Sequence, residues 1–71
     1  MKRRDLLRAT DEAAKAAGLP WTLVREGASH ELWELDGTRV TIPRHRAINE
    51  LTALGILREL DRKLGKDWWR R

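Results

Sequence analysis

The stretch SHELWELDGTRVTI, residues 29–42, decides the fold of this chain. The Asp-Gly pair at 36–37 is the strongest short signal for a tight hairpin, because both turn positions need a positive φ. On either side of the pair, residues 29–35 and 38–42 are predicted to form strands. The stretch therefore predicts two antiparallel strands joined by a two-residue turn.

Outward from this hairpin, the spacing of the apolar residues changes twice. The further predicted elements are a helix over 4–17, a strand over 21–25, a turn over 26–28 and a second helix over 48–64. Gly18 is the expected end of the first helix, and Pro43 ends the third strand. Asn49 or a neighbour is the expected cap of the last helix, and Gly65 is its expected end.

These elements predict an α+β fold in the order α-β-β-β-α. A three-stranded antiparallel sheet with both helices on one face is the economical arrangement, because each helix and the sheet have one apolar face to cover. At 71 residues the chain makes a single domain, residues 1–71. We expect its core to lie within about 2–64 and the sequence KDWWRR, 66–71, to form a basic aromatic tail.

Composition limits the classes of function. The chain has no cysteine, so disulfides and thiolate metal sites are excluded, which fits a reducing cytoplasm. No segment approaches the roughly 20 apolar residues of a membrane span, and charged residues interrupt any signal-peptide core. Lys and Arg number 15 against 11 Asp and Glu, with the excess near the two ends. This net charge of +4 fits a polyanionic partner and a soluble surface of mixed charge equally well.

His30 is the residue whose role most needs an explanation. Strand alternation puts the neighbouring Ser29 on the opposite face, so hydroxyl and imidazole do not meet as nucleophile and base. His30 and His45 are the only histidines, too few for a zinc or iron site. Two readings remain: a surface or half-buried histidine bonded to backbone, or an acid–base group that titrates near neutrality.

Several motifs together resemble the HicA family of small toxins. They are Gly27-Ala28-Ser29-His30, the aromatic Trp33, the Asp36-Gly37 turn, Val40-Thr41-Ile42-Pro43-Arg44-His45 and, in the following helix, Gly55-Ile56-Leu57. The opening Lys2-Arg3-Arg4-Asp5-Leu6-Leu7 is similar to that family's first helix, so the resemblance spans residues 2 to about 60. It implies a fold like that of double-stranded-RNA-binding domains and a ribonuclease that cuts messenger RNA. Because the expected chemistry needs only a histidine, we expect no metal or other cofactor. The resemblance also implies a HicB-like antitoxin as partner, with any oligomer formed through that antitoxin, and His30 as the catalytic residue.

This implied activity is chemically reasonable for one histidine. RNA carries its own nucleophile, the 2′-hydroxyl, so the protein needs to move protons and stabilise charge. The residues expected at the RNA are Gly27, Ser29, Arg25, Arg44 and Arg46. Alternatively, these arginines are surface charges that contact only solvent. His45 is either a second acid–base group or, as we favour, a structural residue before the last helix.

We expect the four tryptophans to have different roles. Trp21 and Trp33 lie on neighbouring predicted strands, where tryptophan usually belongs to the core. For Trp68 and Trp69 three roles stay open: docking under the first helix, stacking on RNA, or filling a groove on the antitoxin.

Two other classes of function compete with the ribonuclease. The first is a non-catalytic double-stranded-RNA-binding module, which places a lysine cluster at the start of its last helix; residues 48–57 here contain no basic residue. The second is an inactive toxin-like domain that only binds a partner.

Overall fold

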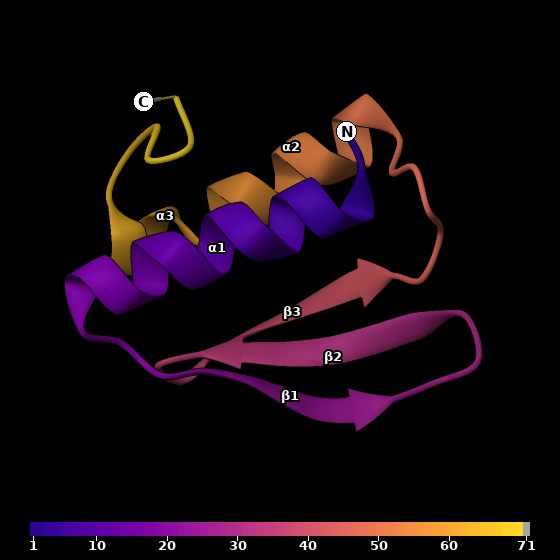
Figure 1. The fold of residues 1–71 in the computed structure, drawn as a ribbon, viewed down its shortest axis with the longest axis horizontal. Helices are drawn as coiled ribbons and strands as arrows, with labels where there is room; N and C mark the ends of the chain where they lie inside the picture. The colour runs from indigo at the N-terminus through magenta and orange to yellow at the C-terminus, as the bar shows by residue number, and fades with distance from the viewer. Residues whose placement is uncertain (71) are drawn as a thin grey trace.

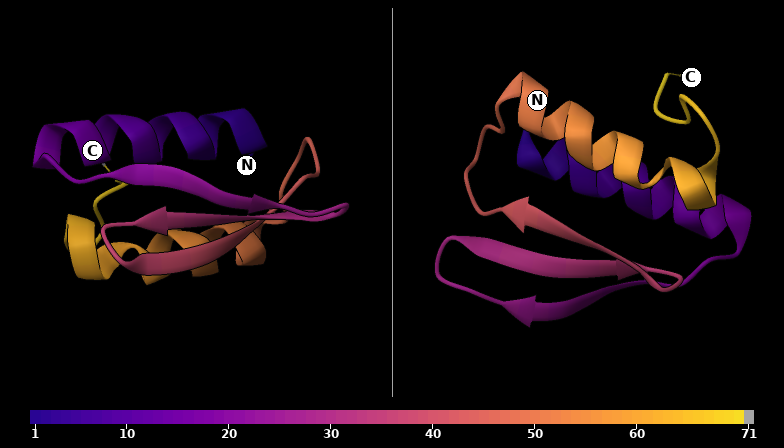
Figure 2. Two further views of the ribbon diagram at one scale, coloured as in Figure 1. Left: turned by 90° about the horizontal axis from the view of Figure 1, so that it is seen from below. Right: turned by 180° about the vertical axis from the view of Figure 1, so that it is seen from behind.

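The computed structural model describes residues 1–70 and has the predicted α+β fold (Figure 1). The elements are α1 (Arg3–Ala17), β1 (Trp21–Glu26), β2 (His30–Leu35), β3 (Thr38–Pro43), α2 (Glu50–Glu59) and α3 (Asp61–Leu64). The strands form one antiparallel sheet in the order β1-β2-β3. Figure 2 shows α1 and α2 side by side over one face of this sheet, so the predicted arrangement is confirmed.

The hairpin at the centre of the fold forms as its sequence predicts. Leu35 pairs with Thr38 across the turn. Asp36 has a φ of 44° and Gly37 a φ of 89°, so both turn residues lie in the left-handed region that a tight hairpin requires. This register determines which side chains of β2 and β3 face the helices.

Alternation along β2 and β3 separates a buried face from an exposed face. Leu35, Val40 and Ile42 are at most 1% exposed and form the floor of the core beneath the helices. Glu31 pairs with Ile42 and is also buried, so it lies on the same face. His30 is one position out of phase and therefore lies on the outer face, away from the helices.

The first helix packs through one stripe. Leu6, Thr10 and Ala14 are spaced four residues apart and are all buried. The Thr10 hydroxyl donates to the Leu6 carbonyl at 2.9 Å, which satisfies the one polar group in the stripe. Gly18 ends the helix with a φ of 69°, as predicted.

The predicted helix over 48–64 is divided in two. Asn49 caps α2, since its side-chain oxygen accepts a hydrogen bond of 2.8 Å from the Leu51 amide. The helix then stops at Leu60, and α3 begins one residue later. No glycine or proline marks this break; instead Leu60 is fully buried there, and α3 lies in contact with α1.

The final turn adds a tryptophan to the core. Trp68 is only 5% exposed, and its indole nitrogen donates to the Leu57 carbonyl at 2.9 Å. It borders a small hollow with Leu64 and three alanines of α1, namely Ala13, Ala16 and Ala17. Trp68 therefore docks beside the first helix, and the core extends past Leu64. Trp69 is half-buried and meets the Trp68 ring edge-on, with centroids 6.0 Å apart.

The other tryptophan pair lies on the sheet. Trp21 and Trp33 stack with ring centroids 4.8 Å apart and both pack against the core, although each stays partly exposed. Trp33 also donates to the Glu31 carboxylate at 3.1 Å.

The link from β3 to α2 is held against the start of α1. Lys2 forms an isolated antiparallel bridge with Ala47, and the Arg3 amide donates to the Arg46 carbonyl at 3.0 Å. The Met1 ammonium donates to Glu50 at 2.8 Å, and this hydrogen bond with its positive charge lowers the pKa of the Glu50 carboxyl. The basic link thus has a defined path beside α1.

Candidate functional site

His30 lies in an open hollow on the outer face of the sheet. It is the first residue of β2 and pairs with Pro43 of β3. The hollow, which we call the turn pocket, is lined by Arg25, Gly27, Ala28, Ser29, His30, Glu31, Leu32 and Thr41. His30 is exposed, and within residues 1–70 its ring makes no hydrogen bond, so the imidazole is accessible to a substrate.

Gly27 closes the turn that carries His30. Its amide donates to the His30 carbonyl at 2.8 Å. A Cβ at this position would lie 2.9 Å from the same carbonyl oxygen, closer than real Cβ atoms come to backbone. The turn therefore needs a glycine here for steric reasons, independent of φ.

Replacing Gly27 with alanine is expected to displace His30 and to destabilise the domain by about 1–3 kcal/mol, because backbone has to move to admit the methyl group. Gly55→Ala in α2 is the matched control, since a Cβ added at Gly55 would meet no neighbouring element within 4 Å. That control should stabilise the domain by about 0.5–1 kcal/mol through helix propensity. Thermal unfolding of both variants checks the pair, and an unchanged midpoint for Gly27→Ala contradicts the steric argument.

Arg44 ties the turn to the end of β3. Its amide donates to the Ser29 carbonyl at 2.9 Å, and its guanidinium donates to the Gly27 carbonyl, also at 2.9 Å. The side chain remains exposed, so its other N–H groups are free to face a ligand. The structure thus brings together four of the residues that the sequence analysis singled out, namely Gly27, Ser29, His30 and Arg44.

A β-bulge in β1 brings Arg25 to the same face. Leu23 lies opposite Trp33, but Arg25 lies opposite Leu32, so Val24 is an extra residue in β1. Simple alternation would place Arg25 with Leu23 on the helix side. The bulge instead turns its side chain to the outer face, where it lines the turn pocket.

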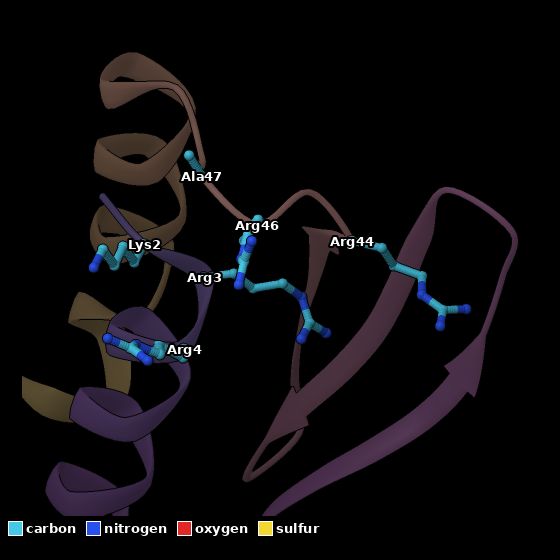
Figure 3. A pocket seen from close by; sticks show the side chains of 6 residues that line it. All are labelled: Lys2, Arg3, Arg4, Arg44, Arg46 and Ala47. Atoms are coloured by element: carbon cyan, nitrogen blue, oxygen red, sulfur yellow. The ribbon is translucent and has the colours of Figure 1, made fainter.

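A second hollow, which we call the basic pocket, lies between the start of α1 and the β3–α2 link (Figure 3). It has a volume of about 740 Å³ and is lined by Lys2, Arg3, Arg4, Arg44, Arg46 and Ala47. Arg46 lines this pocket and not the turn pocket, so the structure separates it from His30. Arg44 lines the basic pocket and also donates a hydrogen bond to the Gly27 carbonyl in the turn. In Figure 3 its side chain extends away from those of Lys2 and Arg4.

Arg3 differs from the other cations of the basic pocket. It forms an ion pair with the buried Glu31 and donates to the Pro43 carbonyl at 3.0 Å. The negative charge of Glu31 therefore balances that of Arg3, and the two contacts hold α1 against β2 and β3. Within residues 1–70, Lys2, Arg4 and Arg46 have no carboxylate within ion-pair distance.

Sequence reasoning did not assign Lys2, Arg3 and Arg4 to a site. The signal was present as an excess of positive charge at the start of the chain, together with the basic residues at 44–46. Only the packing of the two segments against each other shows that they form one pocket.

His45 is exposed and lines neither pocket. Across residues 1–70, no three His, Asp or Glu side chains gather as a possible metal site. None of the helices in this part of the chain has the length and apolar character needed to cross a bilayer.

Comparisons with protein-family models, with curated proteins and with solved structures find no match for this chain. Its chemistry therefore has to be inferred from the site. An accessible imidazole, with Arg25 in the same hollow and Arg44 bonded to the turn that carries it, can exchange protons beside a bound anion.

Proposed function

We propose that this chain is the toxin of a type II toxin–antitoxin pair, similar to HicA, and cleaves messenger RNA in the cytoplasm as a metal-independent endoribonuclease. The observation that carries the proposal is the accessible His30 on a turn that Gly27 and Arg44 hold in place. The cations beside it match the charge of an RNA backbone.

In the proposed reaction His30 acts on a ribose and the phosphate that follows it. Its neutral imidazole takes the proton of the 2′-hydroxyl, whose oxygen attacks the adjacent phosphorus. The bond from phosphorus to the 5′-oxygen breaks, and that oxygen takes up a proton from water. The imidazolium of the exposed His30 then returns its proton to the solvent. The products are a 2′,3′-cyclic phosphate and a 5′-hydroxyl. Arg25 and Arg44 stabilise the charge that develops on the phosphoryl oxygens.

Glu31 has no part in this proton transfer. It follows His30 in β2 but lies on the helix side, where Arg3 and Trp33 satisfy its carboxylate. The histidine therefore acts without a carboxylate partner from its own strand.

The proposal is tested by incubating the purified chain with end-labelled RNA in the presence of excess chelator. We expect cleavage to continue and to yield 2′,3′-cyclic phosphate ends. A DNA strand of the same sequence lacks the nucleophile and should stay intact. Cleavage that stops when divalent metals are removed contradicts the mechanism, and tight RNA binding without cleavage supports the RNA-binding module instead.

A HicB-like antitoxin is the proposed partner that inhibits the enzyme. Leu23 and Val24 support a partner surface, because they are about two-fifths exposed on β1, a strand at the edge of the sheet. The binding-only module has less support, since α2 begins with Glu50 and carries its first cation at Arg58.

A further inference from the structure

The basic pocket has more positive charge than the proposed reaction uses. Arg3 is matched by Glu31, whereas Lys2, Arg4 and Arg46 are exposed and have no acidic partner within residues 1–70. Like charges held close together repel one another, and a bound anion relieves that repulsion. An accumulation of cations of this kind points to a ligand.

The pocket is also positioned by the fold. The Lys2–Ala47 bridge and the hydrogen bond from the Arg3 amide to the Arg46 carbonyl hold its two walls together. The first turn of α1 opens at this place, and its N-terminus adds a partial positive charge. The lining has no large apolar side chain, which favours a phosphate backbone over a lipid or an apolar peptide.

The basic pocket and the turn pocket are connected through one residue. Arg44 lines the basic pocket, and its guanidinium bonds the Gly27 carbonyl beside His30. A strand that places one phosphate at His30 can therefore continue past Arg44 toward Arg46 and Arg4.

We propose that Lys2, Arg4 and Arg46 form a second phosphate-binding site for single-stranded RNA, separate from the site of cleavage. This inference rests on the proposed function for the identity of the ligand. The second site gives the enzyme a minimum substrate length, because an oligonucleotide too short to span from His30 to Arg4 cannot occupy both sites at once.

The test replaces all three residues with glutamine. A matched control makes Arg58→Gln, Arg62→Gln and Lys66→Gln, three exposed cations of the α2–α3 region that remove the same total charge. Binding of 2′-O-methyl RNA, which lacks a free nucleophile, is measured for both variants over a range of salt concentrations. The pocket variant should bind about tenfold more weakly or worse, with the salt slope reduced by about 0.7 for each phosphate that it no longer neutralises.

Cleavage gives the second readout. The wild-type chain should cut a long RNA with a higher kcat/KM than a two- or three-nucleotide substrate, and the pocket variant should lose this preference while still cutting the short substrate. Equal binding and equal length preference in pocket variant and control overturn the second site. The wild-type chain can also fail to cut RNA while its binding still depends more steeply on salt than that of the pocket variant. That result overturns the proposed reaction and supports the second binding site.

Discussion

Replacing His30 with alanine is expected to lower the rate of RNA cleavage by about 10²–10⁴-fold, the usual contribution of a positioned acid–base group. The imidazole is exposed and within residues 1–70 bonds to nothing, so its removal takes away a proton acceptor and leaves the fold unchanged. Cleavage of end-labelled RNA by wild type and variant measures the loss. Circular dichroism of the variant should match that of the wild type.

Two controls make this result specific to His30. Added imidazole should restore part of the activity of His30→Ala, because the open turn pocket admits a small base. His45→Ala tests the other histidine, which lines neither pocket. An equal loss in His45→Ala, or full activity in His30→Ala, contradicts the assignment of the acid–base role.

Replacing Trp68 with alanine is expected to leave most of the protein unfolded at room temperature. Deleting a buried tryptophan side chain costs about 3–5 kcal/mol. A core in a domain of this size rarely supplies more than ~3–5 kcal/mol in total. Trp68 is 5% exposed and joins the end of the chain to α2 through its bond to Leu57, so its loss removes packing and a hydrogen bond together.

Urea denaturation followed by circular dichroism measures this effect. Trp68→Phe separates the two contributions, since phenylalanine keeps most of the packing but leaves the Leu57 carbonyl without its donor, at a cost of about 1–3 kcal/mol. Trp69→Ala should cost less than Trp68→Ala, because Trp69 is only half-buried. If Trp68→Ala unfolds at the same urea concentration as the wild type, residues beyond Leu64 do not belong to the core.

The parts of the structure that the sequence predicts are those that depend on residues adjacent in the chain. The Asp36-Gly37 turn, the Gly18 end of α1 and the Asn49 cap each follow from the conformational preferences or side-chain chemistry of one or two residues. The hollow around His30 was predictable in part for the same reason, because Gly27 and Ser29 are close to it in sequence. Arg44 was expected only as a contact to RNA, and its hydrogen bond to the Gly27 carbonyl had no signal in the sequence.

The break at Leu60 and the burial of Trp68 had no local signal. The spacing of the apolar residues over 48–64 is that of one continuous helix and does not mark a break at Leu60. After the break Trp68 is buried beside Leu64 and the alanines of α1, and this contact exists only after α1 and the end of the chain have packed together.

By itself, the sequence determined the order of the elements, the hairpin register and the position of His30 at the start of a strand, because each depends on residues close together in the chain. The tertiary structure alone decided that the bulge at Val24 turns Arg25 to the face of His30 and that Arg46 lies in a separate pocket with Lys2 and Arg4. Those arrangements depend on pairing between strands and on the packing of segments more than forty residues apart. No local preference encodes such long-range packing, since it forms only when the helices close over the sheet.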